Sequence, residues 1–254
     1  MSEGRALSAR HLDWQACYNV RDLGGLPLAG GGKTRWGSIV RADLLARLTP
    51  AGRGAMLAYG VRTVIDLRGP HEVKEEPTIR GEPGGLAVHN LPLEGYRPEV
   101  SAQIARATSH LEVYALILDH YPGEVAQVLR AIDGAPPGGV VIHCHAGKDR
   151  TGIMSALLLG LAGVPEEAIV ADYAESQERL WPLWKAQVAG SDGDGQDGLW
   201  QRPTTKPETM AGLLEHLRVR YGGVEAYIRG AGLRPEEVAR LKRRLLPEEK
   251  PQNR

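Results

Sequence analysis

A cysteine and an arginine separated by five residues are the side chains of this sequence best suited to chemistry. Cys144 and Arg150 lie in the segment His143 to Gly152, which reads HCHAGKDRTG. A loop of this length can surround a tetrahedral anion, because its successive N–H groups can point inward and the dipole of a following helix adds positive charge. The same field favours the thiolate of Cys144, which is a strong nucleophile. The segment therefore predicts nucleophilic attack on a bound oxyanion.

The other residues of the segment predict how such an anion is held. The planar fork of Arg150 can bind two phosphate oxygens at once, also while the phosphoryl group becomes trigonal. Thr151 can donate a hydrogen bond to the sulfur, and Gly147 allows a tight turn. Lys148 is either a second cation at the rim or a solvated charge at a helix start. The residues predicted to bind the phosphate group are His145, Ala146, Gly147, Lys148, Asp149, Arg150 and Thr151.

Two other interpretations of Cys144 are weaker. A free cysteine at a strand end is usually a small buried hydrophobe, but that role explains neither the spacing to Arg150 nor the strand-to-helix context. His143 and His145 flank the cysteine, and all three are residue types that bind zinc, yet no second cluster supplies further ligands at the usual spacing. We therefore expect no metal site and no cofactor. Cys17, with no basic neighbour closer than Arg21, is interpreted as structural.

The elements that must position this loop follow from hydrophobic patterning. A buried strand is predicted at 61–67, and a second at 140–143 runs into the loop and then into an apolar helix at 153–161. Thr49 as N-cap, Pro50 at the first helical position and Gly60 past the end predict a further helix of about ten residues. Other helices are predicted at 111–133, 165–180, 207–221 and 235–246. Strands alternating with helices predict an α/β fold, with a central, mostly parallel sheet flanked by helices.

Composition limits the remaining possibilities. The chain has 254 residues, 31 basic and 31 acidic side chains, and 42% hydrophobic residues, which favours one globular domain over 1–254 and disfavours a nucleic-acid partner. The longest apolar stretch is too short to cross a membrane. The first residues lack the apolar core of a signal peptide, and two cysteines make no disulfide framework. We expect a cytoplasmic protein, with export by a route without a signal peptide left open.

Beyond the loop, the sequence resembles cysteine-dependent phosphatases of the protein-tyrosine and dual-specificity type. The closer likeness is to their bacterial atypical, triple-specificity branch, which carries HCxAGKDRTG. The matching blocks are Asn19 to Gly25, Val40 to Asp43, Thr63 to Arg68 with Glu72, Asp172-Tyr173, and Tyr221 to Gly223. The resemblance covers about residues 13–246. It implies a phosphatase-like fold and hydrolysis of phosphotyrosine, with phosphoserine, phosphothreonine or phosphoinositides as further substrates.

The resemblance leaves the general acid unassigned. The Trp-Pro-Asp loop of the tyrosine-specific relatives is absent, and the aspartate of the dual-specificity relatives would fall on Gly95. Glu94 is adjacent and is the third candidate, after Asp149 and Asp66. Asp149 in the loop and Asp66 at a strand end match positions discussed as catalytic in the atypical branch. We favour Asp149 as the proton donor and Asp66 as the residue that orients the loop. The alternative for Asp66 is an ion pair with Arg68 or with the phosphate loop.

The resemblance also implies a helical lid over about residues 174–206. It includes Trp181, Trp184 and Trp200 and the polar, glycine-rich segment 190–203, which is predicted to be mobile. Helical spacing of the first two tryptophans is equally typical of core packing.

The catalytic residues expected from all these observations are Cys144, Arg150, Asp149 and Asp66. They would form a cysteinyl-phosphate intermediate on a phosphorylated protein or phosphoinositide, without stable membrane insertion. The oligomeric state stays open. Two alternatives are a catalytically silent phosphate-recognition module, which would usually lack the cysteine, and an enzyme that handles sulfur or arsenate with a similar loop.

Overall fold

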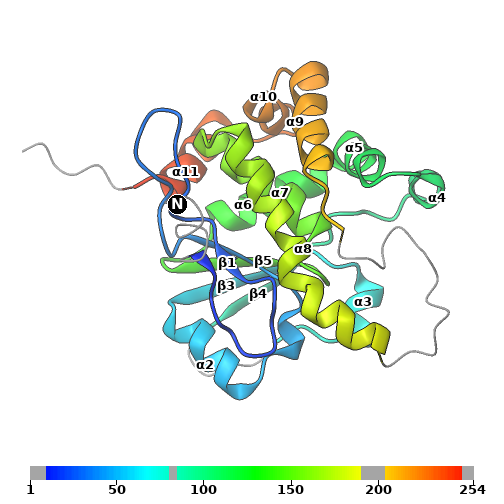
Figure 1. Cartoon of the computed structure of the whole chain (residues 1–254). Coiled ribbons are helices and arrows are strands. Elements are labelled where there is room, and N and C mark those ends of the chain that lie inside the picture. The colour runs from blue at the N-terminus through cyan, green and yellow to red at the C-terminus, as the bar shows by residue number, and fades with distance from the viewer. Residues whose placement is uncertain (1–9, 80–84, 190–203, 248–254) are drawn as a thin grey trace, which may run out of the picture.

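The computed structural model describes residues 10–79, 85–189 and 204–247, and its centre is a five-stranded sheet (Figure 1). The strand order is β1-β2-β5-β3-β4, in which β1 alone is antiparallel to its neighbour. The strands are β1 (Arg21–Asp22), β2 (Ile39–Ala42), β3 (Val61–Asp66), β4 (Ala87–Asn90) and β5 (Gly139–His143). The predicted α/β class with a mostly parallel sheet is confirmed, as are the two predicted buried strands.

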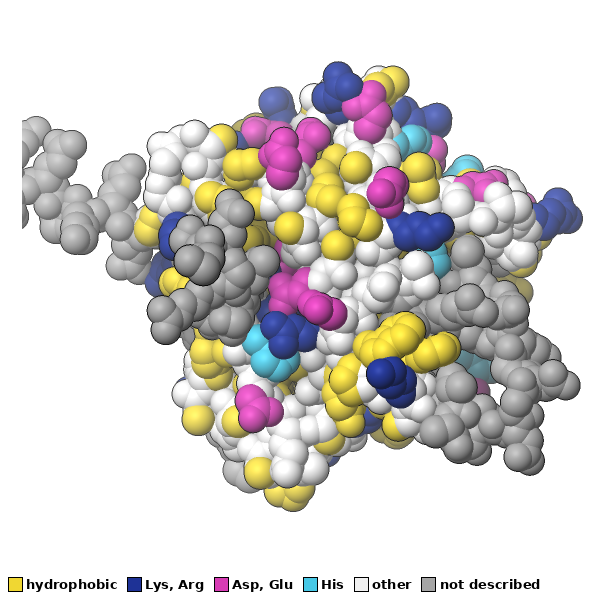
Figure 2. Space-filling view, viewed as in Figure 1, with side chains coloured by type: hydrophobic (Ala, Val, Ile, Leu, Met, Phe, Trp, Pro, Cys, Tyr) yellow, Lys and Arg dark blue, Asp and Glu magenta, His cyan; other side chains and the backbone are white. Residues whose placement is uncertain are grey.

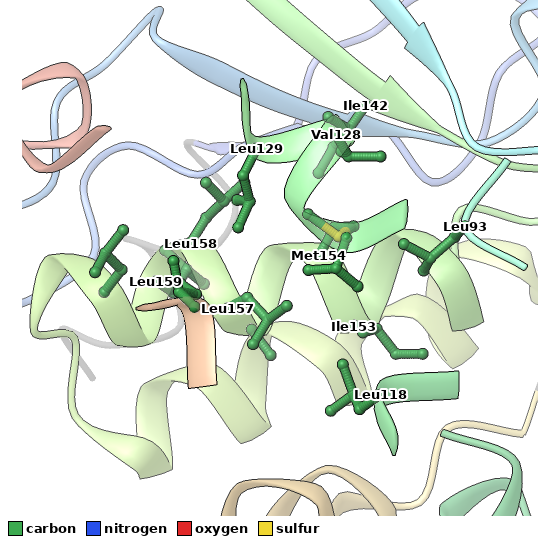
Figure 3. Packing of buried hydrophobic residues seen from close by; sticks show 14 of the residues in the cluster. Leu93, Leu118, Val128, Leu129, Ile142, Ile153, Met154, Leu157, Leu158 and Leu159 are labelled. Atoms are coloured by element: carbon green, nitrogen blue, oxygen red, sulfur yellow. The ribbon is translucent and has the colours of Figure 1, made fainter. Parts of the chain in front are cut away.

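Alternate residues of the central strands enter two separate cores, as expected for a sheet covered on both faces. Ile65 and Ile142 face the larger core, which the C-terminal helices complete. Val64 and Val141 face the smaller core, which contains Met56 of α2. In the larger core, leucines of α7 pack against residues of α6 and β5 (Figure 3). The sheet is thus a rigid middle layer whose strands end beneath the loop of interest.

The helices follow largely from caps and apolar patterning. Thr49 accepts a hydrogen bond from the Gly52 amide at the start of α2, as predicted. α7 ends at Gly163 in the left-handed conformation, and it is apolar on all sides because it lies inside the larger core. The helices are α2 (Pro50–Ala58), α3 (Pro70–Glu75), α4 (Pro98–Arg106), α5 (His110–His120), α6 (Pro122–Asp133), α7 (Asp149–Ala162), α8 (Glu166–Ala189), α9 (Pro207–Tyr221), α10 (Val224–Gly230) and α11 (Pro235–Leu245), with a 3-10 turn at Leu45–Arg47.

Two of the predicted helices differ from the structure. The single helix expected over 111–133 is two helices, α5 and α6, because Pro122 starts a new helix after the non-helical Tyr121. The helix expected over 165–180 continues to Ala189 and contains Pro182 in its interior. The sequence does not predict the short elements α3, α4, α10, β1, β2 and β4, since segments of two to nine residues show too little periodicity.

The expected lid region begins within α8. Trp181 and Trp184 stack there with ring centroids 4.8 Å apart, and the ammonium of Lys185 lies 5.7 Å from the Trp181 ring centroid. Hydrophobic and basic side chains lie side by side over this end of α8 in Figure 2. The segment 190–203 and Trp200 lie outside the described residues, so the lid stays a prediction. No helix among the residues described is long and apolar enough to cross a bilayer.

Candidate active site

The loop that carries Cys144 joins the end of β5 to the start of α7. Cys144 is 2% exposed, and α7 begins at Asp149, so the N-terminus of this helix opens onto the loop. Gly147 has a φ of 63°, and a Cβ at this position would lie 2.4 Å from the carbonyl oxygen of Ala42. Only glycine fits such a close approach of two backbones. The predicted strand-loop-helix context of the cysteine is therefore present.

Three consecutive carbonyl groups of the loop are held by the surrounding protein. The His145 carbonyl accepts from the Leu44 amide at 3.0 Å. The amide of Asn19 donates to the carbonyls of Ala146 and Gly147, each at 3.0 Å. In a planar trans peptide the N–H group points away from the carbonyl. The N–H groups of residues 146–148 are therefore directed away from these partners, as an anion-binding loop requires.

An arginine cluster on one aspartate supports the loop from below. Asp172 of α8 accepts from Arg10 at 2.7 Å, Arg21 at 3.0 Å and Arg41 at 2.6 Å, and all four side chains are buried. Arg41 also donates to the Gly147 carbonyl at 2.7 Å, which connects this cluster to the loop. Burial opposes the ionised form of Asp172, but the three guanidinium charges hold its pKa well below the ordinary value. The pKa of Arg21 falls to about 10, mainly because of burial and then because of the Arg41 charge.

Removing the central charge of this cluster is expected to destabilise the protein. Asp172→Asn leaves buried guanidinium groups without a counterion, which costs about 3–5 kcal/mol of unfolding free energy. Urea denaturation at pH 7 measures this cost. Because the folded-state pKa of Asp172 lies below its unfolded value of about 3.9, the stabilisation is present above that pH and is lost as the pH falls.

The matched control is Glu225→Gln. Glu225 pairs with Lys242, and the two side chains are 48% and 36% exposed; such surface pairs contribute about 0–1 kcal/mol. Equal losses in the two variants would contradict a special role for the buried cluster.

Arg150 is fixed by a carboxylate from α3. Its two terminal nitrogens donate to Glu72, at 2.5 Å from Nη1 and 2.8 Å from Nη2. Burial disfavours the charge of Arg150, but the Glu72 hydrogen bond and the Cys144 charge raise its pKa above the ordinary value. Because Glu72 binds the end of the guanidinium, the side that carries Nε can bind a second partner. Glu72 appeared in the sequence only within a resembling block, and no spacing rule links it to a residue 78 positions away.

Asp149 accepts a hydrogen bond from the hydroxyl of Tyr114. That hydroxyl also lies 2.8 Å from the hydroxyl of Tyr173. The other carboxylate oxygen of Asp149, Oδ2, is 3.6 Å from the ammonium of Lys148. Lys148 is only 2% exposed, so its interpretation as a solvated charge is wrong.

Asp66 lies fully buried at the end of β3. It accepts from Arg68 and Thr78, and its Oδ2 is 3.7 Å from Nε2 of His143. Burial opposes its charge, yet the Arg68 hydrogen bond, followed by His143 and Thr78, lowers its pKa. The ion pair considered for Asp66 is therefore present. His143 donates in turn to the Cys144 carbonyl at 3.0 Å, so that Asp66 and His143 form a buried contact behind the loop.

The remaining predicted residues occupy the rim and the first helical turn. The His145 side chain is 47% exposed and lies 3.3 Å from Glu76, while Ala146 is half-buried. Thr151 is fully buried, and its hydroxyl has no hydrogen-bond partner in the part of the chain that the structure describes. The expected hydrogen bond from Thr151 to the sulfur is therefore not formed in this structure. Within the described ranges, no three His, Cys, Asp or Glu side chains are grouped to hold a metal ion.

Comparison with known proteins supports the chemistry that this geometry suggests. Residues 12–247 match the family described as "Tyrosine phosphatase family". A tyrosine-protein phosphatase of Nostoc commune is 34% identical over 82% of this chain and 74% of its own length. The triple specificity protein phosphatase PtpB of Mycobacterium tuberculosis is 26% identical over 90% of this chain and 96% of its own.

A solved structure, that of TpbA from P. aeruginosa, has 18% identity and a TM-score of 0.35, with 80% of this chain and 83% of that chain covered. The family match extends over nearly all the described residues, and it includes the loop of Cys144 and Arg150 together with Asn19, Arg41 and Asp172 that hold it. The chain therefore belongs to the tyrosine phosphatase family and is an enzyme that acts on phosphotyrosine.

Proposed function

We propose that this enzyme is a phosphomonoesterase that works through a cysteinyl-phosphate on Cys144. The observation that supports it most strongly is the loop itself, whose carbonyls are engaged by Asn19, Arg41 and Leu44 so that its N–H groups are available around the sulfur. Arg150, fixed by Glu72, binds the equatorial phosphate oxygens with its Nε edge. Positioned N–H groups and a guanidinium stabilise the charge that spreads over these oxygens in the transition state.

Each of the other predicted site residues has a place in this mechanism. The hydroxyl of Thr151 has no hydrogen-bond partner among the described residues. In the proposed mechanism it donates to the sulfur of Cys144 and stabilises the departing thiolate when water attacks the intermediate. Asp66 and His143 support the loop from behind, and Asp149 holds Lys148 and Tyr114 at the start of α7. No step needs a metal ion, because the thiolate is the nucleophile and the loop supplies the positive field. Residues 13–246 act as a single catalytic domain.

The proposed substrates are phosphorylated proteins, with phosphotyrosine preferred. The ammonium of Lys148 is buried beside Asp149 rather than presented at the surface, which disfavours it as a contact for a multiply charged inositol head group. Activity on phosphoserine and phosphothreonine is the broader proposal, suggested by the name of the triple specificity relative. A panel of phosphotyrosyl, phosphoseryl and phosphothreonyl peptides and of phosphoinositides tests this order. Faster turnover of phosphoinositides than of all three peptides would reverse it.

Inhibitors provide a test of the proposed nucleophile. Vanadate is expected to inhibit competitively, because it adopts the trigonal-bipyramidal geometry of the transition state. Mild peroxide is expected to abolish activity and thiol reductant to restore it, since a thiolate is oxidised reversibly to sulfenic acid. EDTA is expected to leave the rate unchanged. An enzyme that loses activity in EDTA and resists peroxide would contradict the cysteine mechanism.

A further inference from the structure

The segment after β4 brings a carboxylate to the loop that no assignment so far uses. The amide of Leu91 donates to the Asp66 carbonyl at 2.8 Å, and that of Leu93 donates to the Leu67 carbonyl at 3.3 Å. Leu93 is fully buried in the larger core (Figure 3). Because β3 lies between β4 and β5, these contacts fix the next residue, Glu94, at the carboxyl edge of the sheet beside the Cys144 loop.

Glu94, the third candidate for the acid, faces Arg150 of the loop. Its Oε1 lies 3.9 Å from Nε of Arg150. Gly95, where the resembling dual-specificity phosphatases would place their aspartate, faces elsewhere: a Cβ there would lie 2.4 Å from Glu124 and 3.1 Å from the ring of Tyr121. A side chain at position 95 would therefore point toward Tyr121 and Glu124 rather than toward the Cys144 loop. In this chain the carboxylate that faces the loop belongs to Glu94, one position before Gly95.

The orientation of Arg150 makes this place chemically significant. Glu72 occupies both terminal nitrogens, so a substrate phosphate must approach the edge that carries Nε. Glu94 lies on that edge. Two negative groups cannot share it without repulsion, whereas a protonated carboxyl can donate a hydrogen bond to a phosphate-ester oxygen. The arrangement thus favours a neutral Glu94 in the substrate complex.

Three carboxylates near the loop are committed as hydrogen-bond acceptors in the described part of the chain, and Glu94 is not. Asp66 accepts from Arg68, Asp149 from Tyr114, and Glu72 from Arg150. Among the described residues, the Glu94 carboxyl makes no hydrogen bond, and its side chain is 37% exposed. A group without fixed donors can carry a proton and turn toward a leaving oxygen at the mouth.

The charges that face Glu94 support this assignment. Burial raises its pKa above the ordinary value; the Arg150 charge opposes this, and the Glu72 and Asp149 carboxylates add to it. Tyr121 of the α5–α6 junction is a further titratable neighbour. Burial raises the pKa of its phenol, the Arg97 charge opposes this, and the Glu94 and Glu124 carboxylates add to it. The pKa of Asp66 shifts in the opposite direction: its hydrogen-bond and charge partners lower it below the ordinary value.

We propose that Glu94 is the catalytic acid that protonates the leaving group, in place of Asp149. The inference rests on the proposed cysteinyl-phosphate mechanism. In the first step the sulfur of Cys144 forms a bond to phosphorus, the bond from phosphorus to the ester oxygen breaks, and this oxygen takes the Glu94 proton. In the second step the Glu94 carboxylate removes a proton from water, whose oxygen bonds to phosphorus as the thiolate leaves. Both groups return to their starting forms.

The test compares leaving groups. Wild type, Glu94→Gln and Asp149→Asn are assayed on aryl phosphates from 2,4-dinitrophenyl to phenyl phosphate. For Glu94→Gln we expect near wild-type kcat/KM on the dinitrophenyl ester and a loss of kcat/KM on the order of 10²-fold on the phenyl ester, since general acid catalysis matters only for basic leaving groups. We compare kcat/KM because it covers the steps up to cleavage of the ester bond and leaves out the later attack of water. The alkaline fall of wild-type kcat/KM on phenyl phosphate, where Glu94 loses its proton, should disappear in this variant.

The control is Glu99→Gln, the same change on an exposed residue in the first turn of α4, which should match wild type on every ester. A uniform loss over the whole series for Glu94→Gln would indicate a structural effect and overturn the proposal. A steeper slope for Asp149→Asn alone would assign the proton to Asp149 instead. Failure of wild type to hydrolyse even the dinitrophenyl ester would overturn the proposed function, which is a distinct result.

Discussion

Cys144→Ser is expected to show no measurable turnover of phosphotyrosyl peptide while still binding it. A serine hydroxyl is almost wholly protonated near neutral pH and is therefore a poor nucleophile. Removing a covalent nucleophile costs on the order of 10⁶-fold in kcat in enzymes that depend on one. Binding persists because the loop carbonyls remain held by Asn19 and Arg41 and the N–H groups stay in place. Steady-state assays and calorimetric titration with the peptide measure the two quantities.

Cys17→Ser is the matched control for this experiment. The Cys17 thiol donates to the Leu44 carbonyl, and burial, together with the Asp43 charge, raises its pKa far above the ordinary value. A thiol in such surroundings is inert, and a hydroxyl can make the same hydrogen bond. We expect turnover within about twofold of wild type, a change of about 0.4 kcal/mol in activation free energy. Equal loss in both variants would show that the sulfur of Cys144 has no special role.

The fold could be predicted where a local pattern decides it. Thr49 and Pro50 determine the start of α2, and Gly163 determines the end of α7, because caps depend on single residues with known backbone preferences. The apolar run after the Cys144 loop predicted α7 because a helix inside a core needs no polar face. The break before Pro122 could have been found from the proline alone.

The support of the site could not be predicted in the same way. Arg41 and Asp172 are 131 residues apart, and Arg150 and Glu72 are 78 apart, so no sequence spacing brings them together. The signal available was a charged residue inside an apolar segment, as for Arg41 in β2, since a buried charge requires a partner. That signal shows that a partner exists but does not identify it. The direction of Glu94 likewise depends on how Leu93 is packed.

Arg150→Lys is expected to lower kcat/KM by about 10² to 10³-fold, or about 2–4 kcal/mol of transition-state stabilisation. Arg150 meets Glu72 through two terminal nitrogens and keeps its Nε edge for the phosphate, and a single ammonium cannot satisfy both partners at once.

Arg240→Lys is the control for Arg150→Lys, because Arg240 of α11 also donates to a carboxylate, that of Asp133, through two nitrogens. Losing this paired hydrogen bond, which is outside the active site, should leave kcat/KM unchanged. The unfolding free energy of both variants, measured by urea denaturation, separates a folding defect from a catalytic one. An Arg150→Lys enzyme within about threefold of wild type, roughly 0.7 kcal/mol, would show that positive charge alone suffices and that the fork held by Glu72 is not needed for the reaction.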